Sequence, residues 1–210
     1  MTPLVHPSSR SAIILARGRE GDAIPKRSSD PERQSVLLEY VLDAVWTVVD
    51  EMNILFTQEP ALELVEVIAP FGVKMIIREG KGGDVDALVT GFKMSHSDHC
   101  IVVPENAPFL KPNVIYALFE AAREVDAAIP RWPDGRTEPL LAVYRRKAFV
   151  RAASQYGNIS DAQELANNLY AVRYVDIEKE LRPLDPELHS FFKVESEKSL
   201  EQARVIVSKN

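Results

Sequence analysis

Short apolar runs alternate along this chain with stretches of helical periodicity, and this alternation limits the possible folds more than any other feature. Runs of this length suit buried strands, and helices between them are typical of a mainly parallel sheet covered on both faces. We predict strands at Ala12–Ala16, Met52–Thr57, Val73–Ile77, Cys100–Pro104, Ala127–Pro130, Leu140–Arg145 and Tyr170–Asp176. We predict helices at Pro31–Asp50, Val85–Met94, Asn113–Glu124, Lys147–Tyr156, Ser160–Asn168 and Ser196–Ser208.

The pattern predicts an α/β protein, a three-layer α/β/α sandwich with a Rossmann-like, mainly parallel sheet. We expect a single domain over residues 1–210, with residues 1–10 flexible. A Trp-Pro-Asp-Gly turn interrupts the alternation between Ala127 and Arg145, which favours an antiparallel addition to the sheet there. In the first helix, the apolar stripe is expected to comprise Val36, Leu37, Tyr40, Val41, Ala44 and Val48.

Charge and composition exclude several classes of protein. A net charge of −6 argues against a dedicated nucleic-acid surface, which would be basic. Cys100 lies inside an apolar run, so we expect it to be buried without a disulfide, as in a reducing compartment. No apolar stretch approaches the ~20 residues of a membrane span, and the N-terminus lacks the apolar core of a signal peptide. We therefore expect a cytoplasmic protein that contacts neither membranes nor nucleic acid.

The loops that directly follow strands are the candidate binding loops, because ligands of such sheets bind beyond the carboxyl ends of the strands. In the first of them, Gly18 lets backbone N–H groups approach a phosphate, and Lys26 supplies a cation. The glycines of residues 79–83 can offer N–H groups to a phosphate or a purine edge. An ordinary surface turn and a flexible connector, respectively, are the competing interpretations, since short glycine motifs are weak signals.

Two further loops carry polar residues directly beside predicted strands. Glu105 can hold Mg²⁺ against nucleotide phosphates, and Asn106 can contribute a carbonyl oxygen without charge. A proline-rich turn that only ends the strand is the alternative. Arg136 and Glu138 can recognise a polar second substrate. If the protein is an enzyme, these residue types favour phosphoryl chemistry through positioning and charge neutralisation.

Four motifs stand in a fixed order along nearly the whole chain. They are Leu15-Ala-Arg-Gly18, Glu105-Asn-Ala-Pro-Phe-Leu110, Glu138-Pro-Leu-Leu-Ala-Val-Tyr-Arg145, and Phe191-Phe-Lys-Val-Glu195 before Leu200. In these motifs the chain resembles the MobA-like nucleotidyltransferases, above all the molybdenum cofactor guanylyltransferases. The Gly80–Asp84 segment is also similar to the archaeal adenosylcobinamide-phosphate guanylyltransferases, which share the fold.

The resemblance implies a nucleotide-diphospho-sugar transferase-like fold and a Mg²⁺-dependent transfer of GMP from GTP to molybdopterin or another phosphate-bearing acceptor. It also implies protein partners in cofactor biosynthesis. It assigns Lys26 and Asn106 as catalytic and Glu105 or Asn106 as the metal ligand. The implied binding residues are Leu15, Ala16, Gly82 and Gly83 for the base, Arg17, Gly18 and Arg19 for the phosphates, and Arg136 and Glu138 for the acceptor.

Several signature positions depart from the family pattern. Arg17 replaces the first glycine of the phosphate loop, Asn106 replaces the metal-binding aspartate, and Lys193 and Glu195 replace two asparagines. Because Asn106 removes one negative charge from the expected metal site, a second hypothesis stays open. Under this hypothesis the chain is a non-catalytic nucleotide-binding or regulatory protein of the same fold.

Overall fold

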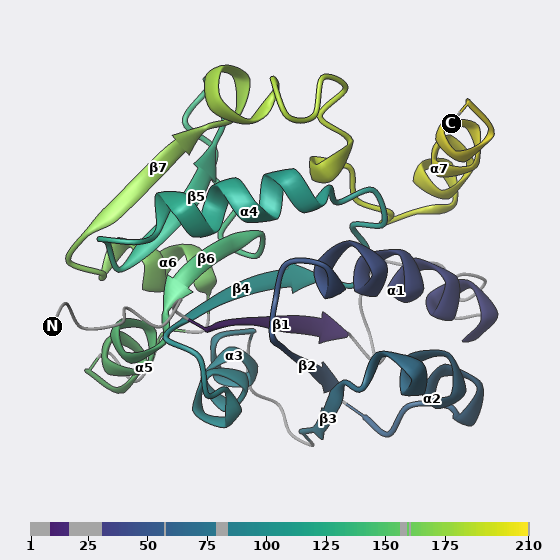
Figure 1. Ribbon diagram of the computed structural model, residues 1–210, viewed down its shortest axis with the longest axis horizontal. Coiled ribbons are helices and arrows are strands. Elements are labelled where there is room, and N and C mark those ends of the chain that lie inside the picture. Colours follow the sequence, from purple (N-terminus) through teal and green to yellow (C-terminus); the bar gives the residue numbers. More distant parts are fainter. Residues whose placement is uncertain are drawn as a thin grey trace, which may run out of the picture.

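One twisted sheet with helices on both faces organises the protein (Figure 1). The computed structural model describes residues 9–16, 31–56, 58–78, 84–155, 159 and 161–209. Its 7 strands lie in the order β3-β2-β1-β4-β6-β5-β7. Their bounds are β1 Arg10–Ala16, β2 Glu51–Phe56, β3 Lys74–Ile77, β4 His99–Pro104, β5 Ala127–Arg131, β6 Ala142–Arg145 and β7 Val172–Asp176. Each predicted strand is thereby confirmed, with ends shifted by a few residues.

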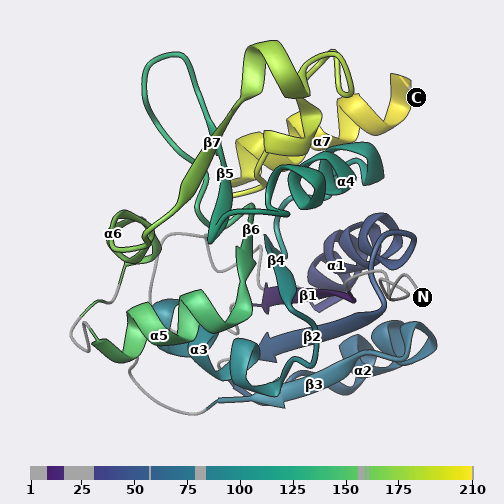
Figure 2. The same ribbon diagram turned by 60° about the vertical axis from the view of Figure 1, so that its left-hand side comes forward.

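The helices divide between the two faces of the sheet, with α1 and α4 on one side and α3 and α5 on the other (Figure 2). Alternate residues of β1 enter the two resulting cores: Ala12 and Ile14 pack in one, and Ile13 and Leu15 in the other. The helices are α1 Pro31–Trp46, α2 Leu62–Ile68, α3 Asp84–Met94, α4 Pro112–Ala121, α5 Arg146–Gln155, α6 Ala162–Asn167 and α7 Glu197–Lys209. Shorter turns of helix are η1 Ala69–Phe71, η2 Ile177–Leu181 and η3 His189–Phe191.

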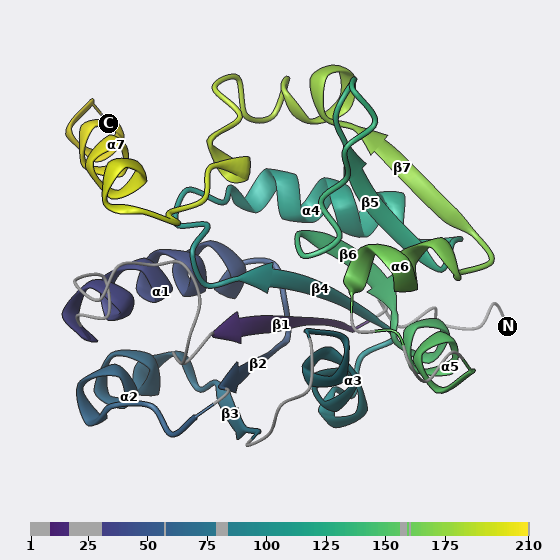
Figure 3. The same cartoon turned by 180° about the vertical axis from the view of Figure 1, so that it is seen from behind.

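The predicted antiparallel addition is confirmed. Strand β6 runs antiparallel to both β4 and β5, whereas β7 is parallel to β5. The connection from β5 to β6 begins with a tight turn in which Gly135 N–H donates to the Trp132 carbonyl at 2.9 Å. Gly135 has a φ of 91°, a conformation that favours glycine. This connection stands out from the sheet near α6, as the view from behind shows (Figure 3).

Two expectations about helices need correction. The buried residues of α1 are Leu38, Val41, Leu42, Ala44 and Val45. Val41 and Ala44 confirm part of the predicted stripe, whereas Tyr40 is 44% exposed and the other three buried residues were not in the prediction. Apolar residues occupy more than one face of α1, and packing against the sheet selects among them. Helix α2 was not predicted, because a short segment rich in valine and isoleucine has little helical preference of its own.

Some individual expectations can also be compared with the structure. Cys100 is buried and free, as predicted. Asp161 caps α6 by accepting hydrogen bonds from the N–H groups of Gln163 and Glu164, next to the predicted helix start at Ser160. Among the helices of the described segments, none is long and apolar enough to cross a membrane.

Gly91 allows α3 to lie close against β1. A Cβ atom at this position would come within 2.8 Å of Ile13 Cγ2. Strand β1 cannot easily shift away from it, because both faces of β1 are packed in the core. We expect Gly91→Val to lower the free energy of unfolding by about 1–3 kcal/mol, measured by urea denaturation. Thr90→Ala, one residue away on the same helix, is the control and should change stability by less than about 0.5 kcal/mol. Equal stability of the two variants would contradict this role of Gly91.

Candidate functional site

The carboxyl ends of β1 and β4 meet at one edge of the sheet. The two strands are parallel neighbours, with Leu15 opposite Pro104. Beyond the end of β4, the N–H of Glu105 donates to the Leu15 carbonyl at 3.1 Å. The structure therefore brings together Leu15, Ala16, Glu105 and Asn106, four of the residues that the sequence singled out.

Asn106 joins this edge to a segment near the C-terminus. Strand β4 ends at Pro104, so Glu105 and Asn106 lie in a turn. Their side chains therefore need not point to opposite faces, as the side chains of adjacent strand residues do. The Asn106 carbonyl accepts a hydrogen bond from Val194 N–H at 2.9 Å, and Asn106 Nδ2 donates to the Val194 carbonyl at 3.4 Å. The second and fourth sequence motifs thus converge in space.

We call residues 185–195 the C-terminal strap, because they cross from the end of β7 to the end of β4. Asp185 anchors the strap from a fully buried position: its Oδ2 accepts the Ser190 N–H at 2.7 Å, and its Oδ1 lies 3.1 Å from Lys111 Nζ. Lys111 N–H in turn donates to Ser190 Oγ at 3.1 Å. Burial alone would raise the pKa of Asp185, but the contacts with Ser190 and Lys111 outweigh it and hold the pKa below its usual value.

Glu138 also contacts the strap. Its Oε1 accepts the Trp132 indole N–H at 2.9 Å, and its Oε2 accepts a hydrogen bond from Lys193 Nζ at 2.6 Å. The Glu138 side chain is 14% exposed and that of Lys193 is 28% exposed. Both carboxylate oxygens of Glu138 therefore have protein partners, and the Trp132 ring also packs edge-on against Phe191 of the strap.

A pocket of about 590 Å³ lies beside this ion pair. It is lined by Arg131, Gly135, Arg136, Thr137, Glu138, Gln163, Asn167 and Tyr174. The Arg131 guanidinium lies 4.8 Å from the centre of the Tyr174 ring. Arg136 is exposed and pairs with Asp134 at 2.7 Å, and this contact holds the pKa of the Asp134 carboxyl below its usual value. Glu138 thus belongs both to the pocket wall and to the contact with the strap.

The remaining predicted residues, Arg17, Gly18, Arg19, Lys26, Gly82 and Gly83, lie outside the described residues. Sequence reasoning did not single out Trp132, Lys111 or Asp185, and it noted Lys193 only as a departure from a motif. No local signal marks Lys111, Asp185 or Lys193, because their partners are remote in the sequence. Trp132 is half-buried and bonds Glu138, six residues along the chain. The N–H of a tryptophan at the edge of a core usually needs an acceptor, and this is the signal by which Trp132 could have been found.

The protein groups that could hold a cation at this edge are few. No group of three or more His, Cys, Asp or Glu residues with the geometry of a metal site occurs among the residues that the structure describes. The Asn106 side chain donates its amide N–H to Val194, and its Oδ1 is the atom that can act as a neutral ligand of a cation. This donor set fits a Mg²⁺ ion that takes most of its ligands from phosphate and water, since such ions need only one or two protein oxygens.

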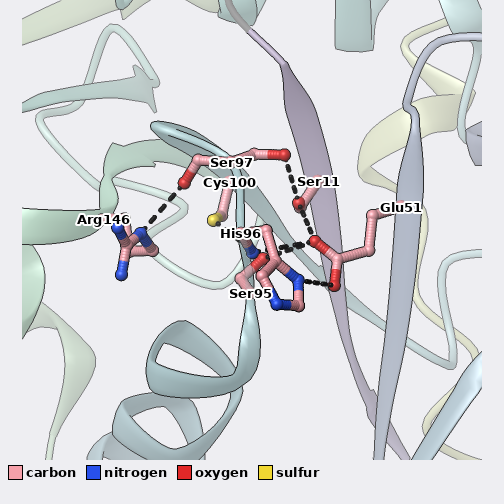
Figure 4. Close-up of polar contacts among 7 residues, drawn as sticks. All are labelled: Ser11, Glu51, Ser95, His96, Ser97, Cys100 and Arg146. Carbon is pink, nitrogen blue, oxygen red and sulfur yellow. Dashed lines mark hydrogen bonds and ion pairs between the residues drawn. The ribbon is translucent and has the colours of Figure 1, made fainter.

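A second polar cluster lies at the opposite edge, near the amino ends of β1, β2 and β4 (Figure 4). Glu51 is its hub: Oε2 accepts hydrogen bonds from Ser11 Oγ at 2.8 Å and His96 N–H at 3.0 Å, and Oε1 lies 3.2 Å from His96 Nδ1. In a catalytic triad the histidine stands between the acid and the nucleophile, whereas here the carboxylate stands between serine and histidine. This arrangement joins the strands and the loop after α3, and it does not activate the serine.

Glu51 should make folding stability sensitive to acid. Burial raises its pKa, but hydrogen bonds from His96 and Ser11 outweigh burial and lower the pKa below the usual 4.5. The stabilisation is therefore complete above pH 4.5 and is lost as the pH falls through the lower folded-state pKa. We expect Glu51→Gln to cost about 1–2 kcal/mol at pH 7 and progressively less in acid, measured by urea denaturation at several pH values. The exposed Glu63→Gln is the control, and a pH-independent cost at Glu51 would contradict the expectation.

Comparison with known proteins gives consistent matches. Residues 12–172 match the family model of the MobA-like NTP transferase domain. The chain is 32% identical over 206 residues to a probable molybdenum cofactor guanylyltransferase of Methanosarcina mazei, covering 92% of this chain and 89% of that protein. The corresponding protein of Methanosarcina acetivorans is 31% identical over 205 residues, with the same shares of 92% and 89%.

Solved structures share the fold. The molybdopterin-guanine dinucleotide biosynthesis protein A of Archaeoglobus fulgidus superposes with a TM-score of 0.73 at 24% identity, covering 95% of this chain and 100% of that one. A CMP:2-keto-3-deoxy-manno-octonic acid synthetase complexed with CTP gives a TM-score of 0.68 at 15% identity, with shares of 96% and 99%. At these identities the likeness concerns the fold alone, and it confirms the predicted α/β architecture.

Proposed function

The chain belongs to the MobA-like NTP transferase family, and on this premise we propose that it is a guanylyltransferase that transfers GMP from GTP to molybdopterin. The observation that carries the proposal is the meeting of three family motifs at one edge: Leu15 contacts Glu105, and Asn106 is bonded to Val194. Two relatives that match over most of the chain carry the name molybdenum cofactor guanylyltransferase, which supports this substrate pair.

The reaction needs positioning and charge neutralisation more than covalent chemistry. An oxygen of the acceptor phosphate forms a bond to the α-phosphorus of GTP, the bond from that phosphorus to the bridging oxygen breaks, and pyrophosphate leaves. Backbone groups of Leu15 and Ala16, with Gly82 and Gly83, are proposed to contact the base. The phosphates are assigned to Arg17, Gly18, Arg19 and Lys26.

Mg²⁺ is the cation that this donor set fits. Glu105 and the Asn106 amide oxygen would hold it from the protein side. When bound, the ion neutralises negative charge on the phosphate oxygens. The acceptor is assigned to the pocket beside Arg136 and Glu138, whose volume of about 590 Å³ is within the usual range for small-molecule sites.

The proposal is tested by incubating the protein with GTP, Mg²⁺ and molybdopterin. We expect pyrophosphate release that depends on the acceptor, together with the guanine dinucleotide product, detected by mass spectrometry. Titration calorimetry with GTP and Mg²⁺ alone examines the nucleotide half of the site. A folded protein that gives no heat with millimolar GTP and no product would refute the nucleotidyltransferase assignment. An acceptor panel that includes adenosylcobinamide phosphate tests the alternative acceptor.

Removing Glu105 should reveal whether it supplies the charge that Asn106 lacks. We expect Glu105→Ala to lower the rate of GMP transfer at least about tenfold and to raise the Mg²⁺ concentration needed for half-maximal rate, because loss of a ligand charge weakens binding of a hard cation. Glu124→Ala, which removes an exposed carboxylate beyond α4, is the matched control. An unchanged Mg²⁺ requirement in Glu105→Ala would show that the metal site lies elsewhere.

One observation favours a second candidate function, a non-catalytic nucleotide-binding or regulatory role. The Asn106 amide donates to the Val194 carbonyl, a bond that the family's aspartate cannot make in its ionised form. Asn106→Asp discriminates between the two functions. If the parent is inactive and the variant releases pyrophosphate from GTP, the chain is a degenerate member of the family. If the parent is active and the variant is less active, the Asn106–Val194 bond is part of a working site.

A further inference from the structure

The ion pair between Lys193 and Glu138 occupies a distinctive place in the fold. Lys193 immediately precedes Val194, whose backbone is bonded twice to Asn106 at the end of β4. Its ammonium group contacts Glu138, which lines the pocket. Lys193 therefore stands between the edge proposed to hold the nucleotide phosphates and the pocket proposed to hold the acceptor.

The ammonium group retains donors for a ligand. A lysine carries three N–H donors, and Glu138 Oε2 accepts one of them. The side chain is partly exposed, at 28%, so the remaining donors are accessible. Because Glu138 is itself an anion, the group of this pair that can bind an anionic ligand is the Lys193 cation.

Trp132 and Glu138 fix the position of that cation. The indole N–H holds Glu138 Oε1 at 2.9 Å, and the Trp132 ring packs on Phe191, two residues before Lys193. A free lysine side chain loses considerable rotamer entropy when it binds a ligand, and a carboxylate that already holds it reduces this cost. Lys193 also neutralises Glu138, which would otherwise repel an anionic ligand from the pocket.

We propose that Lys193 binds the phosphate group of the acceptor and that Glu138, held by Trp132, is the positioning residue for its ammonium group. The inference rests on the proposed function for the identity of the acceptor. It changes the expected role of Glu138, which acts on the acceptor through Lys193. The pocket then takes a phosphate monoester whose phosphate lies toward the strap and whose remaining part extends toward Gln163 and Asn167.

Two ligands that differ only in a phosphate test this assignment: 6-hydroxymethylpterin monophosphate and 6-hydroxymethylpterin. The reporter is the indole N–H signal of Trp132 in a ¹⁵N-labelled sample, with the signal of Trp46 on α1 as an internal reference. We expect the monophosphate to shift the Trp132 signal in a saturable manner and to leave the Trp46 signal in place. A wild-type protein whose Trp132 signal does not respond to millimolar monophosphate overturns the proposal.

Variants separate phosphate binding from a merely structural ion pair. We expect Lys193→Gln to weaken binding of the monophosphate at least about tenfold while binding of the alcohol stays the same, because one charge-assisted hydrogen bond is lost. Lys179→Gln removes the same charge from an exposed ion pair with Asp176 and should leave both affinities unchanged. Equal affinity of wild type and Lys193→Gln for the monophosphate overturns the proposal.

The Glu138→Gln variant tests whether Glu138 positions the Lys193 ammonium group or only adds negative charge near the phosphate. If Glu138 only adds negative charge near the phosphate, its removal should tighten binding of the monophosphate. If Glu138 positions Lys193, the variant should bind the monophosphate more weakly, and that is the result we expect. Tighter binding would contradict the positioning role.

Failure of the proposed function can be told apart from failure of this inference by comparing the binding of GTP with the binding of the monophosphate. If GTP does not bind but the monophosphate binds in a Lys193-dependent manner, the guanylyltransferase assignment fails and the phosphate site stands.

Discussion

Replacing Lys111 with Met is expected to lower the free energy of unfolding by about 3–5 kcal/mol, because it leaves a buried carboxylate without its counter-charge. The carboxylate is that of Asp185, which is fully buried and lies 3.1 Å from Lys111 Nζ. Methionine keeps the length of the side chain, so water has little additional access to Asp185. Urea denaturation at pH 7 measures the loss.

The double variant Lys111→Met/Asp185→Asn is the control for this prediction. An asparagine side chain cannot carry a charge, and its carbonyl oxygen can still accept the Ser190 N–H, so most of the lost stability should return.

The pH dependence of stability provides a second check. In the wild type, the pKa of Asp185 is lowered, so its stabilising contribution is present above the usual 3.8 and is lost as the pH falls through the folded-state value. The difference between wild type and Lys111→Met should therefore narrow in acid, and a constant difference would contradict the mechanism.

The strands could be predicted from the sequence because their signal is local. The run at Ala12–Ala16 is apolar on both faces of the chain, and such a run has few alternatives to a central strand. The turn at Gly135 could also be predicted locally, because the Trp-Pro-Asp-Gly sequence is typical of a turn. The buried face of α1 could not be chosen with the same certainty, since Tyr40 and Leu42 are both apolar and the sheet decides which of them it covers.

The candidate site could be predicted only at the ends of the strands. The loops after the strands at Ala12–Ala16 and Cys100–Pro104 were predicted to be binding loops, because ligands of such sheets bind beyond the carboxyl ends of the strands. The strap was not foreseen as a structure, since its bonds join residues far apart in the sequence: Asn106 and Val194 are 88 positions apart, and Glu138 and Lys193 are 55 apart. Such pairs become visible only when the chain is folded. For this reason Lys193, an unexplained departure from a motif in the sequence, acquires a proposed role in the structure.

Lys26→Ala is expected to lower the rate of GMP transfer at saturating GTP and acceptor by about 10²–10³-fold, as loss of a single preorganised group that stabilises transition-state charge typically does. Lys26 lies outside the described residues, and its assignment rests on the resemblance of the phosphate loop. The cation is expected to neutralise charge on the leaving pyrophosphate, which develops only as the reaction proceeds. The effect should therefore appear in kcat, measured by pyrophosphate release under saturating conditions.

Lys26→Arg, which keeps the charge, should recover part of the rate, and Arg27→Ala removes a neighbouring charge as the control. The comparison with Lys193→Gln tests the assignment more sharply, because Lys26 is proposed to stabilise the leaving pyrophosphate and Lys193 to bind the acceptor phosphate. Lys193 binds the acceptor before and during transfer, so its loss should raise the KM for the acceptor more than it lowers kcat. Loss of Lys26 should lower kcat more than it raises the KM for the acceptor. If both variants raised the acceptor KM and left kcat intact, Lys26 would be a second acceptor ligand, and the stabilisation of the leaving group would have to come from another part of the phosphate loop.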